Sequence, residues 1–185
     1  MDKLSMLTES KNTTKLTAIY TDVDDLEKFA VGIIVACNNK HFILSSVTRS
    51  GSNDGLVLFE TDSIIMQEFD SKYINKIKIL CNNCHFKPSY MPCCTDNLLY
   101  DILLFAKENQ FICSIELNHT GYYDCIGTII NLDDSYCTLN SITADGESNG
   151  VCYIPICNIT KISCNSEDEQ TISILYNYYR THIQE

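Results

Sequence analysis

The strongest constraint on the fold of this chain is an internal repeat. The stretch from Gly127 to Gly150, GTIINLDDSYCTLNSITADGESNG, aligns without a gap with Gly32 to Gly55, GIIVACNNKHFILSSVTRSGSNDG, which lies 95 residues earlier. Over residues 32–80 this offset gives twelve identical pairs, where average residue usage would give roughly three or four by chance. The chain is therefore predicted to be a tandem duplication of one unit of roughly 90 residues.

Each copy of the repeat has the residue pattern of five short strands. We predict them in the first copy at 17–21, 31–37, 41–48, 56–60 and 63–68, and in the second copy at 111–117, 125–131, 136–143, 151–154 and 158–163. Helices are predicted at 3–10, after Asp70 or Ser71, over 96–109, and after a capping box at Ser166 to Glu169. Five such strands in a flat sheet would leave two bare edges, and bending into a small, partly open barrel is the usual solution.

The predicted fold class is mainly β (α+β): two tandem five-stranded small β-barrels, each flanked by helices. The first barrel unit is predicted at 1–80 and the second at 95–185. Residues 81–94, CNNCHFKPSYMPCC, contain two prolines and no hydrophobic periodicity, so they are predicted to form the linker.

Composition limits the compartment and the partners. The first residues contain no apolar stretch of signal-peptide length, and no run approaches about 18 apolar residues, so we expect a cytoplasmic protein without membrane contact. The eleven cysteines are then expected to be reduced thiols. Residues 1–94 carry ten Lys/Arg and eleven Asp/Glu, whereas residues 95–185 carry three and thirteen. The second unit is therefore expected to repel nucleic acid, which makes RNA a disfavoured partner.

A spaced motif begins each copy of the repeat. Gly127, Ile129, Asp133 and Tyr136 lie at positions 0, 2, 6 and 9 of the second copy, and the first copy has Gly32, Ile34, Asn38 and His41 there. This spacing resembles the first motif of the Sm-like (LSm) proteins, and the order of predicted elements is similar to their fold, a terminal helix before a strongly bent five-stranded barrel. An SH3-like barrel would have the same general form.

The resemblance implies RNA stacking on the ring at the ninth position, here His41 and Tyr136. In Sm-like proteins an Asn follows that ring, and an Arg from a second motif completes the nucleotide site. This chain has Phe42 and Cys137 in place of the Asn. The second motif is absent from both copies, which have Thr61-Asp62-Ser63 and Cys157-Asn158 there. Rings at strand starts also commonly pack against the core or its rim, which is the alternative for both residues.

Positive charge gathers only in the first unit. Lys72, Lys76 and Lys78 share one side of a predicted helix, and Arg49 lies in the preceding Gly/Ser/Asn/Asp loop. We take His41, Tyr136, Arg49, Lys72 and Lys76 as the candidate binding residues. A solvated helix face is the ordinary explanation of such lysines, and a polyanion patch is the alternative.

The linker cysteines form the candidate metal site. Cys81, Cys84, Cys93 and Cys94 have the spacing C-x₂-C-x₈-C-C, and four thiolates near a turn are suited to tetrahedral zinc. Adjacent cysteines rarely both reach one metal, so buried or idle thiols are the alternative, and we expect no cofactor.

The motifs do not predict an enzyme. Cys84 and His85 are neighbours in sequence, which does not make a catalytic pair, and Asp133-Asp134 lies where a hairpin turn needs Asp. We expect a non-enzymatic interaction or regulatory protein that acts through protein–protein contacts, or through self-association at sheet edges. The alternatives are an RNA-binding regulator that uses the first unit and a small-ligand-binding protein with a pocket between barrels or protomers.

Overall fold

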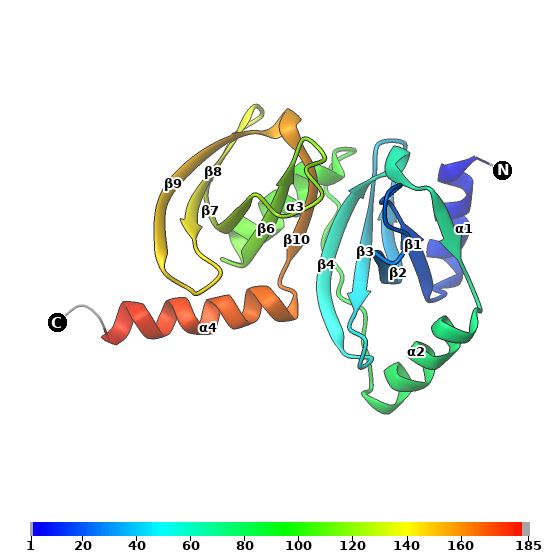
Figure 1. Ribbon diagram of the computed structural model, residues 1–185. Coiled ribbons are helices and arrows are strands. Elements are labelled where there is room, and N and C mark those ends of the chain that lie inside the picture. The colour runs from blue at the N-terminus through cyan, green and yellow to red at the C-terminus, as the bar shows by residue number, and fades with distance from the viewer. Residues whose placement is uncertain (1, 183–185) are drawn as a thin grey trace. The chain divides into compact units, whose positions relative to one another are not determined.

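The chain divides into two compact units in a computed structural model that describes residues 2–182 (Figure 1). Unit 1 is Met1–Leu99 and unit 2 is Tyr100–Glu185, so the division falls inside a helix, α3 (Leu98–Glu108). Each unit contains five strands in an antiparallel sheet. The fold class is therefore α+β with β structure predominant. Within residues 2–182, no helix has the length and apolar content needed to cross a bilayer.

Unit 1 is a sheet with a helix on each face. Its elements are α1 (Lys3–Thr13), β1 (Thr17–Tyr20), β2 (Phe29–Cys37), β3 (His41–Val47), β4 (Asn53–Glu60), the 3-10 turn η1 (Thr61–Ser63), β5 (Met66–Glu68) and α2 (Lys72–Asn83). The strands lie in the order β5-β1-β2-β3-β4. Leu7 of α1 packs with Phe42 and Phe59 on one face of the sheet. On the opposite face, Ile74 and Ile77 of α2 pack with Val31 and Val47. Two apolar clusters thus share one sheet.

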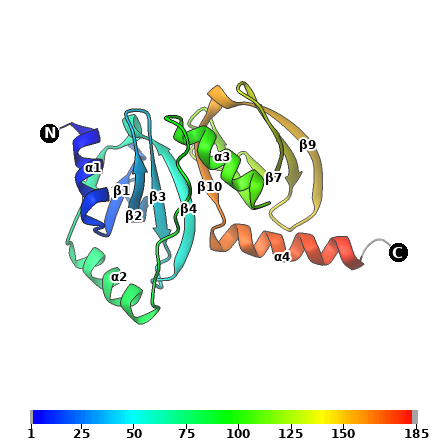
Figure 2. The ribbon, with the colours of Figure 1, turned by 180° about the vertical axis from the view of Figure 1, so that it is seen from behind.

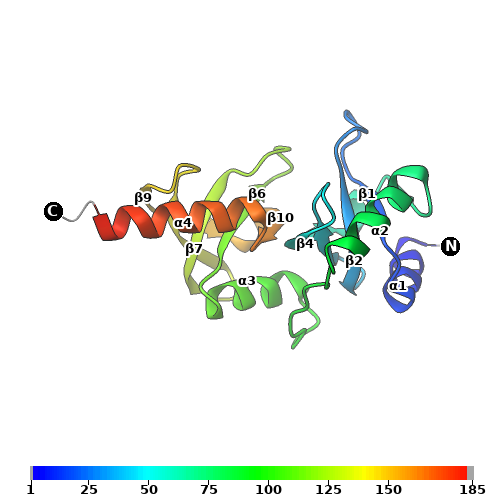
Figure 3. The same cartoon turned by 90° about the horizontal axis from the view of Figure 1, so that it is seen from below.

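Unit 2 has the same order of strands. Its elements are α3, β6 (Ile112–Leu117), β7 (Cys125–Leu132), β8 (Tyr136–Ile142), β9 (Ser148–Pro155), the 3-10 turn η2 (Ile156–Asn158), β10 (Ile159–Cys164) and α4 (Glu167–His182). The strand order is β10-β6-β7-β8-β9. Figure 3 shows α3 and α4 as separate helices beside these strands. Ile172 of α4 packs with Ile112 and Ile142.

The two units share irregular details as well as element order. A β-bulge lies between Ile34 and Ala36 in β2, and another between Ile129 and Asn131 in β7, at the same 95-residue offset. Gly32 and Gly127 also have the same surroundings. A Cβ built on Gly32 would lie 2.2 Å from the carbonyl oxygen of Ser45, and one on Gly127 would lie 2.1 Å from that of Asn140. A side chain at either position would therefore push the neighbouring strand away.

The structure corrects several boundaries and the closure of the sheets. β4 begins at Asn53, inside the predicted 49–55 loop; β5 is shorter than predicted; and α2 continues to Asn83, so the segment predicted as a linker from residue 81 begins with helix. Among the described residues, no strand pairing closes β5 onto β4 or β10 onto β9. Each sheet is therefore open. Cys81 is buried with Ile74 and Ile77, so it continues the apolar side of α2 by one more turn.

The predicted capping box at the start of α4 is confirmed. The backbone N–H of Ser166 donates to Glu169 Oε2 at 2.6 Å, and the N–H of Glu169 donates to Ser166 Oγ at 3.4 Å. Each side chain thus satisfies a backbone donor that the helix itself leaves without an acceptor. Glu169 is buried, and this burial raises the pKa of its carboxyl, against the hydrogen bonds from Ser166, Ser114 and Ser163 that lower it.

Glu169 is expected to make the stability of unit 2 fall as pH rises. Because the folded state holds the carboxyl proton more tightly than the unfolded chain does, its contribution is fully present below the ordinary pKa of 4.5 and is lost as pH rises through the raised value. Glu169→Gln keeps a capping box without a titrating group, so it should remove this loss. Glu169→Ala also removes the titrating group, and it should cost about 1 kcal/mol of cap energy relative to Glu169→Gln. Urea midpoints at about pH 4 and about pH 8 measure both effects. Equal pH dependence in wild type and Glu169→Gln would contradict the assignment.

Candidate functional site

The two candidate stacking rings lie at equivalent positions with different exposure. His41 begins β3 and is half-buried, and burial, followed by the charge of Lys40, lowers the pKa of its imidazole. The ring is therefore neutral near pH 7 and offers no positive charge to a phosphate. Tyr136 begins β8 and is 50% exposed. Of the two candidate rings, Tyr136 is therefore the one more available for stacking.

The position that holds Asn in Sm-like proteins is inside the core of both units. Phe42 is fully buried and stacks on Phe59 across β3 and β4, with ring centroids 5.3 Å apart. Cys137 is fully buried in β8, and burial raises the pKa of its thiol to about 11. Neither side chain is available to hold a nucleotide.

The structure does not bring the basic candidates of unit 1 together with His41. Arg49 follows the end of β3, whereas His41 begins it, and seven strand residues separate these ends by roughly 20 Å. Lys72 and Lys76 are exposed in the first half of α2. Arg49 lies beside the other end of α2, because the next loop residue, Ser50, accepts a hydrogen bond from Cys84 Sγ through its carbonyl oxygen at 3.4 Å. These side chains therefore form separate features and no single pocket.

The linker cysteines also lie in different environments. Cys81 is buried in α2, where burial raises the pKa of its thiol, whereas Cys84, Cys93 and Cys94 are exposed. Within residues 2–182, no three His, Cys, Asp or Glu side chains are placed to hold a metal ion together. The structure therefore does not bring these four candidate cysteines together. Helix α2 explains this, since it fixes Cys81 on its inner side before the chain turns.

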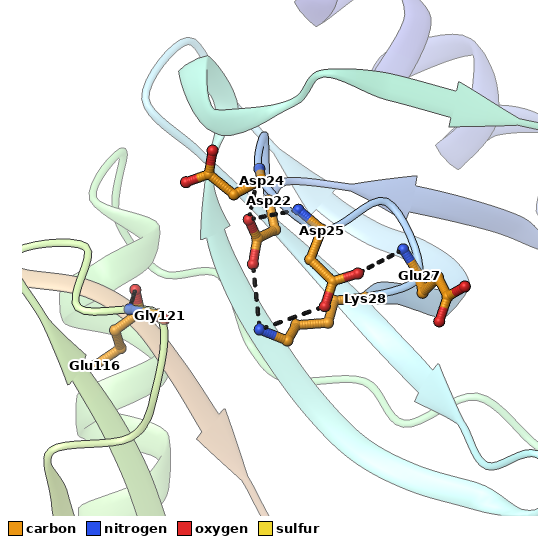
Figure 4. A network of polar contacts seen from close by, with 7 residues as sticks. All are labelled: Asp22, Asp24, Asp25, Glu27, Lys28, Glu116 and Gly121. Carbon is orange, nitrogen blue, oxygen red and sulfur yellow. Dashed lines mark hydrogen bonds and ion pairs between the residues drawn. The ribbon is translucent and has the colours of Figure 1, made fainter.

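The acidic turn between β1 and β2 is held by its own hydrogen bonds (Figure 4). Asp22 Oδ1 accepts the backbone N–H of Asp24 at 3.0 Å and that of Asp25 at 3.2 Å. These bonds, with Lys28 nearby, lower the pKa of Asp22. Lys28 Nζ lies 3.5 Å from Asp22 and 3.6 Å from Asp25. The same figure shows the loop of unit 2 after β6, where the N–H of Gly121 donates to Glu116 Oε1 at 3.1 Å. In both places the carboxylates accept backbone N–H groups and so hold a loop in one conformation.

Unit 1 has a small hollow beside the end of α1. Its volume is about 280 Å³, and it is lined by Met6, Glu9, Ser10, Thr13, Lys15 and Phe69. Ser10 Oγ donates to the carbonyl oxygen of Met6 and accepts from Gln67 Nε2, each at 2.8 Å. The lining thus combines apolar groups with one ammonium and one carboxylate, which suits a small amphipathic molecule.

The two units differ in the burial of equivalent residues on β9, and sequence reasoning missed this difference. Val151 is 50% exposed and Tyr153 is 75% exposed, whereas their equivalents in β4, Leu56 and Leu58, are 2% and 0% exposed. Tyr153 pairs with Thr138, Val151 with Asn140, and Pro155 with Tyr136, so Tyr136, Val151 and Tyr153 project from the same side of the sheet. We call these three residues the β9 face. Alternation predicts this strand, but it cannot predict whether an apolar position has a cover.

The comparisons with known proteins give no family for this chain. No family model, no curated protein and no solved structure matches it.

Proposed function

We propose that this chain is a non-enzymatic interaction protein, built from two small units of the Sm-like kind, that acts through protein–protein contacts. One observation carries the proposal. The same strand position is buried in unit 1 and bears exposed apolar side chains in unit 2, at Val151 and Tyr153. A cluster of exposed apolar side chains that includes two tyrosines is typical of an interaction surface, because aromatic residues are enriched where proteins meet.

The position of β9 in its sheet supports the same proposal. β9 lies at one end of the strand order of unit 2. An outermost strand offers backbone groups for the addition of a further strand, so it serves partner binding and self-association alike. β9 has eight residues, so it offers a long template for strand addition.

RNA binding is less well supported than protein binding. The ring of His41 is half-buried, and Arg49 and Lys72 flank different ends of α2. The more exposed ring, Tyr136, belongs to unit 2, whose residues 100–185 carry twelve acidic and three basic side chains. Such a field opposes the phosphate contacts that supply most of the affinity for nucleic acid.

Small-ligand binding is the second candidate function. The hollow between α1 and Phe69 favours it, with Lys15 and Glu9 at its wall. A cavity of about 280 Å³ is near the lower limit of ligand sites. The pocket that we predicted between barrels or between protomers stays a prediction.

Comparative purification tests the proposed function. Tagged wild-type protein, Tyr153→Glu and Tyr122→Glu are purified from the native cells, and co-purifying proteins are quantified by mass spectrometry. Tyr122 is the matched control, because it is 66% exposed in the same unit but lies in the loop after β6. We expect the amount of one or more co-purifying proteins to fall at least about tenfold with Tyr153→Glu and to stay unchanged with Tyr122→Glu. A tenfold fall corresponds to a loss of about 1.4 kcal/mol of binding free energy.

Native mass spectrometry of the same samples separates the alternatives. A retained small molecule that is lost on Lys15→Ala would favour the hollow. Bound RNA that dissociates steeply as salt rises would favour the RNA alternative. Equal protein partners in all three samples would contradict a contact through β9.

A further inference from the structure

The β9 face is equivalent to a face of unit 1 on which the chain places its own extended segment. After α2 the chain turns at His85, which has a φ of 53°, and residues 86–91 run back without helix or strand structure. Figure 2 shows this segment passing beside β4 on its way to α3. Its sequence is FKPSYM, which alternates apolar side chains with a lysine and a serine.

Hydrogen bonds fix the segment on the sheet of unit 1. The N–H of Ser89 donates to Ser45 Oγ at 2.8 Å. The side-chain amide of Asn53 donates to the carbonyl oxygen of Lys87 at 2.8 Å and to Ser89 Oγ at 2.9 Å. Ser45 pairs with Leu56 across β3 and β4, so the segment lies on the side of the sheet where Leu56 and Leu58 are buried.

Unit 2 has no such segment on its corresponding side within the described residues. The 95-residue offset places residue 86 at Thr181, which is still in α4, and α4 continues past the β8–β9 hairpin (Figure 1). Asn140, the equivalent of Ser45, donates instead to the hydroxyl of Tyr176 at 3.2 Å. Helix α4 thus occupies the first part of this side of the sheet, and the β9 face beyond it stays exposed.

The charge around the β9 face selects a class of partner. Residues 125–155, which contain β7, β8 and β9, carry four carboxylates and no Lys, Arg or His. Asp133 and Asp134 lie in the turn next to Tyr136, and Asp145 and Glu147 lie at the other end, in the β8–β9 turn. Asp133 accepts the N–H groups of Ser135 and Tyr136, which lower the pKa of its carboxyl. The apolar strip therefore lies between two acidic turns.

We propose that the β9 face binds an extended segment of a partner protein in which apolar residues alternate with lysine or arginine. The inference rests on the proposed function and names its partner class. The apolar residues of the partner cover Val151 and the rings of Tyr136 and Tyr153, as residues 86–91 lie along the face of unit 1. Its cations lie next to the carboxylates of the turns and over the tyrosine rings. A second copy of this chain is a poorer occupant, because its net charge is −11.

A library of displayed ten-residue peptides tests the proposal on the full-length protein. We expect the enriched peptides to combine Lys or Arg with apolar residues and to lack Asp and Glu. Fluorescence anisotropy of the most enriched peptide should show binding at least about tenfold weaker to Tyr153→Glu and unchanged to Tyr122→Glu. Asp134→Lys should weaken binding without touching the apolar contact, and binding to wild type should weaken as salt rises.

The outcomes separate this inference from the proposed function. Enriched peptides that bind Tyr153→Glu as well as wild type, or that are acidic, would overturn the inference. A dimer seen by light scattering that is lost on Tyr153→Glu would make the occupant a second copy, so the proposed function would stand and the inference would fall. RNA bound through Tyr153 would overturn both. Far-UV circular dichroism checks that each variant is folded. If Tyr153→Glu does not fold, Asp134→Lys gives an independent test, because Asp134 lies on an exposed turn.

Discussion

Phe42→Asn is expected to destabilise unit 1 by about 5 kcal/mol and to create no RNA-binding site. The substitution introduces the side chain that Sm-like proteins have after the ring position. Phe42 is fully buried against Phe59, so the change removes aromatic packing, which costs about 3–5 kcal/mol, and leaves a buried amide without a designed partner. Urea denaturation followed by tyrosine fluorescence measures the loss, because the chain has no tryptophan.

An apolar control separates packing from polarity. Phe42→Leu should cost about 1.5 kcal/mol, because it keeps an apolar side chain in the same space. Tyr136→Asn, at the exposed ring position of unit 2, should change stability by less than about 0.5 kcal/mol. A folded Phe42→Asn variant that binds oligouridine would show that the position faces a site, contrary to the structure.

Gly127→Ala is expected to lower the stability of unit 2 by about 3 kcal/mol. The new Cβ would lie 2.1 Å from the carbonyl oxygen of Asn140, which is part of β8 and has no flexible end that could move away. The strands β7 and β8 would have to separate, and the hydrogen bonds between them would lengthen. The urea midpoint and the melting temperature both report this change.

Gly150→Ala is the control for Gly127→Ala. Gly150 has a φ of 79° and nothing within 4 Å of an added Cβ, so its substitution should cost about 1 kcal/mol through backbone strain alone. Gly32→Ala, the equivalent of Gly127→Ala in unit 1, should have an effect of the same size, since its Cβ would lie 2.2 Å from Ser45 O. If Gly127→Ala cost no more than Gly150→Ala, the close approach of β7 and β8 would be wrong.

Local sequence patterns predicted the elements well where a cap or a turn marks their ends. Ser71 caps α2 through its side chain, and the Ser166–Glu169 box caps α4, both as predicted. The lysines of α2 face solvent, and Ile74 and Ile77 face the core, because the 3.6-residue period places them on opposite sides. The closure of the sheets was beyond this kind of prediction, since pairing between the outermost strands depends on how far each sheet bends.

The surroundings of the candidate site residues were beyond sequence patterns, for a physical reason. A motif gives spacing along a strand, and spacing does not reveal which residue the other elements will bury. His41 and Tyr136 share a motif position, yet one ring is half-buried and the other is half-exposed. The cysteines named as zinc candidates are separated in a similar way, because α2 holds Cys81 in the core while Cys93 and Cys94 lie in the exposed segment that follows.

The sequence by itself determined the repeat, the order of helices and strands, the two glycines that let strands approach, and the acidic charge of residues 95–185. Each of these depends on local chemistry, which one stretch of chain carries with it. Only the tertiary structure decided which copies of those elements are covered. Leu58 and Tyr153 occupy the same strand position, and one is buried while the other is exposed. The chain after α2 turns back along the sheet of unit 1, whereas α4 continues through the equivalent residues of unit 2.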